Sequence, residues 1–218
     1  GPLLTFPRCF LQMNCLDDGT LVATGGGSTL WQGAVVQSST ELLLPGGEGW
    51  VLGPSMLVQR AGHGACVHVD GGLYVCGGYA GGLDYLRSCE RLDLGTGKFT
   101  PVVSMGEMRT GAAVAAGPDG CIYAVGGSND GYNGHGSAER MDPRVGKWER
   151  LPNMATQRGY CASAFGARGG LFVSGGVHAD SFKRSLEVLD PRAGAWFVLP
   201  GSQTNDTQRA DHQMLHVL

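Results

Sequence analysis

LYVCGG, residues 73–78, places a run of bulky apolar residues directly before two glycines. The same arrangement returns as IYAVGG at 122–127 and LFVSGG at 171–176, and in looser form as TLVATGG at 20–26. Near-continuous apolar residues over so short a run are typical of a β-strand that is buried on both faces. Because this strand recurs at nearly equal intervals, we expect a repeat architecture.

Three further landmarks recur in the same order around these strands. Successive aromatic residues lie 49, 49 and 48 residues apart, a glutamate precedes each by nine residues, and an arginine follows each by ten to thirteen. The aromatics are Trp50, Phe99, Trp148 and Trp196, the glutamates are Glu41, Glu90, Glu139 and Glu187, and the arginines are Arg60, Arg109, Arg158 and Arg209. Arg8 is the matching arginine of the first unit. Composition alone does not produce such an order, so the chain is predicted to be a repeat protein.

Each unit contains four strand patterns and no helical periodicity. In the unit that starts at Arg60, AGHGACVHV is a strand of small residues, LYVCGG is the second strand, SCERLDL alternates as the third and KFTPVVSM is the fourth. The Asp142-Pro143 and Asp190-Pro191 sequences are typical of the turn after the third strand. Four short antiparallel strands in about 49 residues describe one blade of a β-propeller.

The paired glycines and the aromatics have a structural explanation in a propeller. Glycine allows a positive φ and lets the backbone of a neighbouring blade come close. The aromatic at the start of the outer strand is expected to fill the gap that widens between blades with distance from the axis. We therefore predict that LYVCGG is architecture and carries no function of its own.

The landmarks place the whole chain, residues 1–218, in one domain. The complete units are 8–59, 60–108, 109–157 and 158–208, and RADHQMLHVL at 209–218 has the opening of a further unit. A closed ring of four blades has no place for this additional inner strand. We expect four full blades plus the first strand of a fifth, as the C-terminal part of a larger propeller whose remaining strands lie upstream.

Composition excludes several functional classes. Apolar residues make up 42% and charged residues 16%, which is enough for a buried core, and the 38 glycines far exceed the usual share of about 7%. The net charge of −3 gives no field for nucleic acid or anionic membranes, and no apolar run approaches the roughly 18 residues of a spanning helix. Most of the seven cysteines lie in apolar strand patterns, which predicts small buried residues in a reducing compartment, the cytoplasm.

No motif for catalysis or metal binding emerges. His63 and His68 are five residues apart on a predicted strand and therefore point to opposite faces. His135 and His178 fall in loops without a visible partner, and NDGYNG at 129–134 lacks the spacing of an EF-hand and is predicted to be a turn. We predict no enzymatic activity, no metal site and no cofactor.

The repeated units resemble the kelch repeat over essentially the whole chain. The resemblance rests on LYVCGGYAGGLDYLRSCERLDLGTGKF, IYAVGGSNDGYNGHGSAERMDPRVGKW and LFVSGGVHADSFKRSLEVLDPRAGAW. These stretches are most similar to the propellers of Kelch-like proteins, in which BTB and BACK domains precede six kelch blades. The resemblance implies an all-β, kelch-type β-propeller of four-stranded antiparallel blades within a six-bladed ring. The first unit departs from the pattern, with Leu44 at the aspartate position and a longer loop at 26–41.

The resemblance also implies a partner-binding end. In Kelch-like propellers one end presents arginines from the starts of inner strands, serines before third strands and tyrosines after Gly-Gly. The matching residues are Arg60, Arg109, Arg158 and Arg209, Ser88, Ser137 and Ser185, and Tyr79. Several guanidinium groups around a pore mouth would suit a protein or peptide with acidic residues. The alternative is that these arginines bond backbone carbonyls between blades.

The function implied by the resemblance is protein binding. We expect the substrate-recognition propeller of a cullin-RING ubiquitin ligase adaptor, with a cullin bound through domains outside this chain. The alternatives are a structural or cytoskeletal scaffold without a ubiquitin role and, more remotely, a propeller enzyme. Upstream BTB and BACK domains would favour the adaptor, an upstream coiled coil would favour the scaffold, and an enzyme would require turnover or a bound metal.

Overall fold

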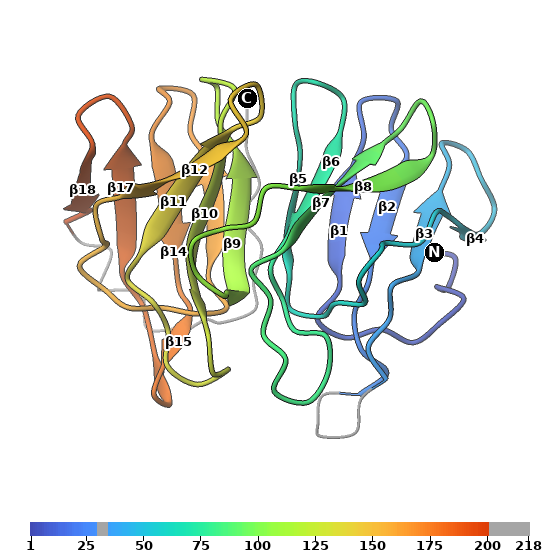
Figure 1. Ribbon diagram of the computed structural model, residues 1–218, viewed down its shortest axis with the longest axis horizontal. Helices are drawn as coiled ribbons and strands as arrows, with labels where there is room; N and C mark the ends of the chain where they lie inside the picture. Colours follow the sequence, from blue (N-terminus) through green and yellow to red (C-terminus); the bar gives the residue numbers. More distant parts are fainter. Residues whose placement is uncertain (30–34, 201–218) are drawn as a thin grey trace.

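The computed structural model describes residues 1–29 and 35–200, and this part of the chain is built from strands and loops with no helix. Four four-stranded antiparallel sheets lie side by side, and a two-stranded hairpin extends from the last of them (Figure 1). Within the described ranges no helix is long and apolar enough to cross a membrane. The strand expected at 209–218 lies outside the described residues.

Each sheet falls within one of the four complete units and is called here a blade. The strands of a blade are adjacent in chain order, from the first to the fourth. Blade 1 has β1 (Gln12–Cys15), β2 (Leu21–Thr24), β3 (Thr40–Leu43) and β4 (Val51–Leu52), and blade 2 has β5 (Gly64–Val67), β6 (Leu73–Cys76), β7 (Cys89–Asp93) and β8 (Lys98–Val102). Blade 3 has β9 (Thr110–Ala116), β10 (Ile122–Ser128), β11 (Ala138–Asp142) and β12 (Lys147–Leu151). Blade 4 has β13 (Ala162–Phe165), β14 (Leu171–Ser174), β17 (Leu186–Asp190) and β18 (Ala195–Val198), and the hairpin of β15 (Val177–His178) and β16 (Ser181–Phe182) lies between its second and third strands.

The first strands of the four blades form the inside of the molecule. β1 lies beside β5, β5 beside β9, and β9 beside β13, and all four line a central cavity of about 800 Å³. Small residues such as Gly64, Ala65, Ala112 and Ala113 line this cavity, because four strands converge there and leave little room for long side chains. This is the β-propeller arrangement expected from the sequence.

The Gly-Gly pairs act as predicted at the boundary between blades. All four pairs have positive φ, from 57° at Gly25 to 96° at Gly26. A Cβ on Gly77 would lie 2.3 Å from the carbonyl oxygen of Arg109 in blade 3, and the N–H of Gly78 donates to that same oxygen at 2.8 Å. A side chain at this position would therefore separate two blades as well as strain the backbone.

The aromatic of the outer strand fills the space between blades, which confirms the prediction for three units. Phe99 packs with Leu16 and Val22 of blade 1. Trp148 packs with residues of blade 2 and Trp196 with residues of blade 3, and each indole N–H donates to a carbonyl oxygen in the segment after the preceding blade's last strand (2.9 and 2.8 Å). The core is thus a series of apolar layers between adjacent sheets.

Candidate partner-binding end of the propeller

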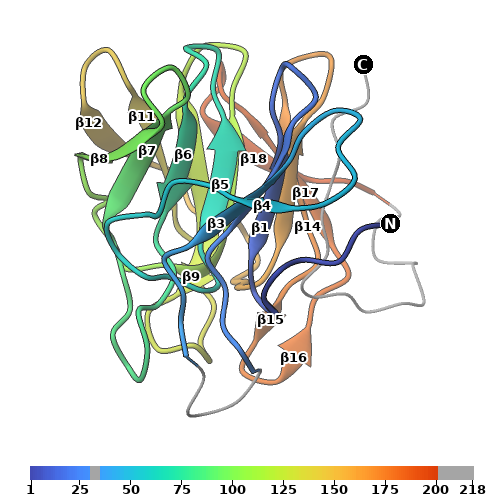
Figure 2. The same ribbon diagram turned by 90° about the vertical axis from the view of Figure 1, so that its right-hand side faces the viewer.

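The two ends of the propeller differ in the length of their connections. One end, the turn end, carries the short turns between first and second strands and between third and fourth strands. The other, the loop end, carries the loops between second and third strands and the linkers between blades, and it lies at the bottom of Figures 1 and 2. The second-to-third-strand loops span 25–39, 77–88, 129–137 and 175–185. Every predicted site residue that the structure describes belongs to the loop end.

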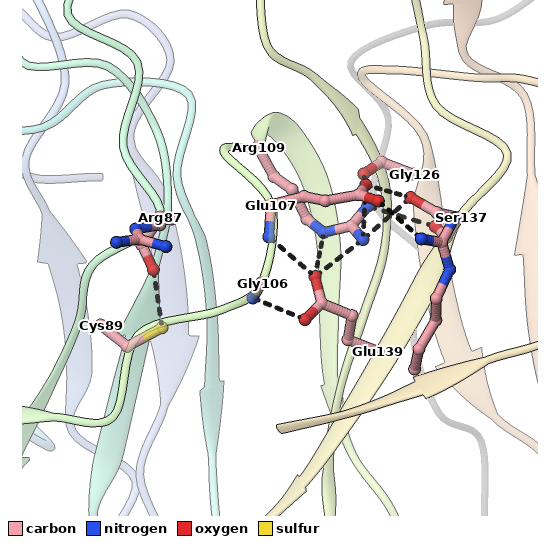
Figure 3. Close-up of polar contacts among 9 residues, drawn as sticks. Arg87, Cys89, Gly106, Glu107, Arg109, Gly126, Ser137 and Glu139 are labelled. Atoms are coloured by element: carbon pink, nitrogen blue, oxygen red, sulfur yellow. Dashed lines mark hydrogen bonds and ion pairs between the residues drawn. The ribbon is translucent and has the colours of Figure 1, made fainter. Parts of the chain in front are cut away.

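Arg109 lies at the loop end but is fully buried (Figure 3). Its Nη1 donates to the carbonyl oxygens of Gly126 (2.6 Å) and Ser137 (3.2 Å), and its Nη2 donates to the hydroxyl of Ser137 (2.9 Å). Its Nε and Nη2 also donate to the carboxylate of Glu139, at 3.2 and 2.9 Å. A buried guanidinium is tolerated only when it is paired and hydrogen-bonded in this way.

Glu139 extends this set of contacts to the linker between blades 2 and 3. Its carboxylate accepts hydrogen bonds from the backbone N–H groups of Gly106 (2.7 Å) and Glu107 (3.3 Å). Glu139 therefore joins the linker that enters blade 3 to the third strand of that blade. Arg109 bonds Glu139 and also the carbonyl oxygen of Gly126, so it joins this contact to the Gly-Gly pair. The arginine, glutamate, serine and first glycine of the sequence repeat thus form one bonded unit, called here the blade clip.

The blade clip recurs in the other units with the same geometry. The guanidinium–carboxylate distances are 2.9 Å for Arg8–Glu41, 2.6 Å for Arg60–Glu90 and 2.8 Å for Arg158–Glu187. In each unit an Nη1 donates to the first glycine of the pair at 2.7 Å, and the glutamate accepts from two consecutive backbone N–H groups. The serines bonded by these guanidiniums are Ser39, Ser88 and Ser185.

The prediction that Arg60, Arg109 and Arg158 contact a partner is therefore corrected. All three are 0% exposed, and their guanidinium groups bond the blade that each residue begins. The alternative had the arginines bonding backbone carbonyls between blades; their guanidinium groups do bond backbone carbonyls, but those of their own blade. Ser88, Ser137 and Ser185 serve the same blade clips; Ser137 is buried and the other two are half-buried. Arg209 lies outside the described residues.

Tyr79 remains at the surface of the loop end. It is half-buried and follows the Gly-Gly pair of blade 2, where its backbone exchanges two hydrogen bonds with Ala61 (3.0 and 2.9 Å). Burial raises the pKa of its hydroxyl, with Cys9 and Tyr85 adding to the shift. Tyr79 is thus a predicted site residue that the structure leaves partly accessible and that belongs to no blade clip.

The loops of blades 2, 3 and 4 are bonded to one another in sequence. The Tyr85 hydroxyl donates to the carbonyl oxygen of Asp130 (2.7 Å), and the Tyr132 hydroxyl donates to the carboxylate of Asp180 (2.6 Å). Within NDGYNG, the Asp130 carboxylate accepts the backbone N–H groups of Tyr132 and Asn133 (2.8 and 2.7 Å), which confirms that this segment is a turn. The loop end is therefore a connected rim whose shape depends on contacts between blades.

Among the described residues, the second-to-third-strand loop of each blade exposes one large apolar side chain. The exposed fractions are 68% for Val35, 84% for Leu83, 50% for Tyr132 and 47% for Phe182. A hollow of about 400 Å³ lies at the same end, between the linker at 153–157 and the blade 4 loop, with Lys183 in its lining. Exposed apolar side chains together with a polar hollow are features of a surface that binds another protein.

The cations of the rim are residues that the sequence analysis missed. Arg87 and Arg184 are exposed and Lys183 is half-exposed, and none forms an ion pair within residues 1–29 and 35–200. Arg87 and Arg184 directly precede Ser88 and Ser185, so they hold the same place in two repeats. The signal that could have identified the two arginines is their position directly before the repeated serine, which only two of the four units share.

His63 has a structural role, as predicted. It is 1% exposed, and its Nε2 lies 2.8 Å from the hydroxyl of Thr24 in blade 1. Burial, together with the charge of Arg60, lowers the pKa of the imidazole to about 3. In the part of the chain that is described, no three His, Cys, Asp or Glu side chains converge as a metal site would require.

Comparisons with known proteins agree with this architecture. The kelch motif matches residues 60–106 and 108–155. A solved structure titled "Structure of YjhT" superposes with a TM-score of 0.77 at 15% sequence identity, over 95% of this chain and 74% of that chain. The search of curated proteins finds no match. With its four-stranded blades and repeated blade clips, the chain is a β-propeller, and its second and third units match the kelch motif.

Proposed function

We propose that this propeller is a protein-binding module that holds a protein or peptide partner at the loop end. The observation that carries the proposal is the exposed rim of Val35, Leu83, Tyr132 and Phe182, which projects from four successive blades. Long loops on a rigid scaffold are where binding residues are usually found. The proposed role is not catalytic.

Charge at the loop end favours a partner with acidic residues. Arg87, Lys183 and Arg184 have no ion-pair partner among the described residues, whereas the carboxylates of Asp130 and Asp180 accept hydrogen bonds from rim residues. Asp84 is the exposed acid of the blade 2 loop. A guanidinium can bind a carboxylate with two parallel hydrogen bonds, and exposed cations also attract an acidic partner during association.

A more specific role is that of the substrate-recognition propeller of a cullin-RING ubiquitin ligase adaptor. Similarity of the blade motifs to Kelch-like propellers supports this role, and the seven free cysteines support a cytoplasmic location. A cullin is expected to co-purify with the protein from the cells that express it. Recovery of cytoskeletal proteins without a cullin would instead favour the scaffold role.

Binding at the loop end can be tested before the natural partner is identified. Peptides selected on the wild-type protein from a displayed random library should be enriched in Asp and Glu and contain apolar residues. Their affinity for the R87A/R184A variant should fall at least tenfold, which corresponds to about 0.7 kcal/mol for each lost charge contact.

The matched control removes two exposed arginines from the turn end. Arg168 and Arg192 are exposed there, and R168A/R192A changes the net charge by the same amount. This variant should bind the selected peptides like the wild type. Equal loss in both variants, or no loss in R87A/R184A, would overturn the proposed location.

A further inference from the structure

Two cysteines face each other across the second and third strands of blade 2. Cys76 ends β6, Cys89 begins β7, and the two are directly opposite in the antiparallel register. The N–H of Gly77 donates to the carbonyl oxygen of Ser88 at 3.0 Å, so the next pair along the ladder is hydrogen-bonded. Hydrogen-bonded and non-hydrogen-bonded pairs alternate in antiparallel strands, so the Cys76–Cys89 pair is of the non-hydrogen-bonded kind. Such pairs place their Cα atoms about 4.5 Å apart. Disulfides need about 4.4–6.8 Å, so this register permits one.

The two thiols also share one environment. Both lie in the apolar cluster between blades 2 and 3, beside Met105 and Ala124. The Cys89 thiol contacts the carbonyl oxygen of Arg87 at 3.8 Å, as Figure 3 shows. Interaction with the neighbouring Cys89 side chain and burial raise the pKa of the Cys76 thiol well above its usual value. Both residues are free thiols, and the strand register places them directly opposite each other.

The propeller does not need cysteine at this place in a blade. The same register holds a Thr24–Thr40 pair in blade 1, a Val125–Ala138 pair in blade 3 and a Ser174–Leu186 pair in blade 4. Blade 3 shows that two apolar side chains are sufficient for the fold here. The thiol chemistry of blade 2 is thus additional to its architecture.

We propose that Cys76 and Cys89 are an oxidisable dithiol site, which a small peroxide converts into an intramolecular disulfide. One sulfur attacks a peroxide oxygen, the O–O bond breaks, and the departing hydroxide takes the thiol proton as water, which leaves a sulfenic acid. The second sulfur attacks the sulfenic sulfur, the S–O bond breaks, and the departing hydroxide takes the second thiol proton. Two electrons pass from the thiols to one peroxide, and hydrogen peroxide thereby becomes two waters.

Access to the site requires the packing between blades 2 and 3 to open locally. Cys76 and Cys89 are 0% and 1% exposed, and a buried, protonated thiol reacts slowly. The side chains packed with them include Met105, Ala124 and Trp148 at the boundary between blades 2 and 3, and the loop at 77–88 connects the two cysteines. The disulfide would close this loop at its base. An effect of that closure on partner binding, through Tyr79 and Arg87, rests on the proposed function, whereas the crosslink does not.

The test uses the whole chain, first reduced and then incubated while folded with hydrogen peroxide. After alkylation and tryptic digestion, we expect the peptide 61–87 linked to the peptide 88–91, with fragmentation assigning the bond to Cys76 and not to Cys66. The oxidised protein should also unfold about 5 °C higher than the reduced protein, because the crosslink restricts the unfolded chain. Dithiothreitol should reverse both changes.

Two variants make the result decisive. C76V/C89A copies the blade 3 pair, so it should fold and show neither the crosslink nor the shift. T24C/T40C places the same pair in blade 1, where Gly25 donates to Ser39 in the same way (3.1 Å), and should gain a second crosslink. Oxidation of the exposed Cys15 without a 76–89 crosslink, or a crosslink that forms only in urea, would overturn the proposal. These outcomes do not depend on partner binding, which the R87A/R184A variant tests separately.

Discussion

The loop end and the turn end of each blade are built from the same four strands, but they satisfy their backbones differently. At the turn end, the Asp142 carboxylate accepts the N–H of Arg144 at 2.9 Å and Gly146 adopts a φ of 66°, so the turn is complete within one hairpin. At the loop end, Arg109 and Glu139 join a linker, a strand and a glycine corner across two blades. Changes at the turn end should therefore have local effects, whereas changes at the loop end should disturb two blades at once.

The strongest test of this difference removes a buried arginine. Arg109→Ala should lower the free energy of unfolding by about 3–5 kcal/mol, because it leaves the Glu139 carboxylate buried without its cation. The matched change at the turn end is Arg144→Ala. Arg144 is 78% exposed and paired with Asp142 at 2.8 Å, so this change should cost less than about 1 kcal/mol. Urea denaturation measures both, and similar losses would show that the blade clips do not hold the blades together.

A pair of glycines with nearly the same φ separates backbone strain from contact between blades. Gly77 has a φ of 69°, and a Cβ added to it would lie 2.3 Å from the carbonyl oxygen of Arg109, whereas Gly146 has a φ of 66° and nothing within 4 Å of the same point. Gly77→Ala should cost about 3 kcal/mol, and Gly146→Ala about 1 kcal/mol from the left-handed conformation alone. Equal thermal shifts in the two variants would mean that blade separation adds nothing.

Acid should weaken the loop end through His63. Its pKa is about 3 in the folded protein and about 6.5 in the unfolded chain, so below pH 6.5 the unfolded chain binds the proton. The contribution of the neutral His63 to the free energy of unfolding is therefore fully present above about pH 6.5 and is lost as the pH falls toward 3. At pH 5 the loss is on the order of 2 kcal/mol. His63→Gln should reduce this pH dependence in denaturation measured between pH 8 and 5. An unchanged slope would contradict the assignment.

The smallest expected effect distinguishes two tyrosine hydroxyls. Tyr132 bonds Asp180 across two blades at the loop end, and Tyr123 bonds Asp119 within one blade at the turn end (2.6 and 2.7 Å). Changing either tyrosine to phenylalanine should cost about 1 kcal/mol of stability at most. Tyr132→Phe should also weaken selected peptides about threefold, because the rim loses one of its links, while Tyr123→Phe should not. Titration of both variants with one peptide makes the comparison.

The fold could be predicted from the sequence because every landmark of the repeat has a structural role. Gly77, Glu90 and Arg60 recur at fixed spacing because Arg60 donates hydrogen bonds to the other two, and Phe99 recurs because a gap between blades must be filled. The periodicity therefore reported the blade number and the strand order within each blade. It also located the loop end, although it gave no sign of which side chains are exposed there.

The site could be predicted only in part for the same reason. An arginine repeated in every unit suggested a ring of cations at the opening of the central channel. The arginine repeats because each blade needs its own clip, as Arg158 shows in blade 4. The exposed rim residues vary between units: Arg184 has an arginine counterpart only in blade 2, at Arg87, so the periodicity gives at most a partial signal. Burial depends on where the chain places neighbouring loops, such as the contact of Tyr132 with Asp180, and spacing within one repeat does not contain that information.

The two-sided attachment of the clip arginines has a consequence for how the molecule unfolds. The guanidinium of Arg109 bonds its own blade, while its carbonyl oxygen accepts the N–H of Gly78 in the blade before it. The corresponding carbonyl of Arg158 accepts the N–H of Gly127. One residue therefore couples the order of two neighbours, as in a one-dimensional chain of interacting units. Unfolding that begins at one clip should therefore pass to the neighbouring blades, so that the blades unfold together in one transition.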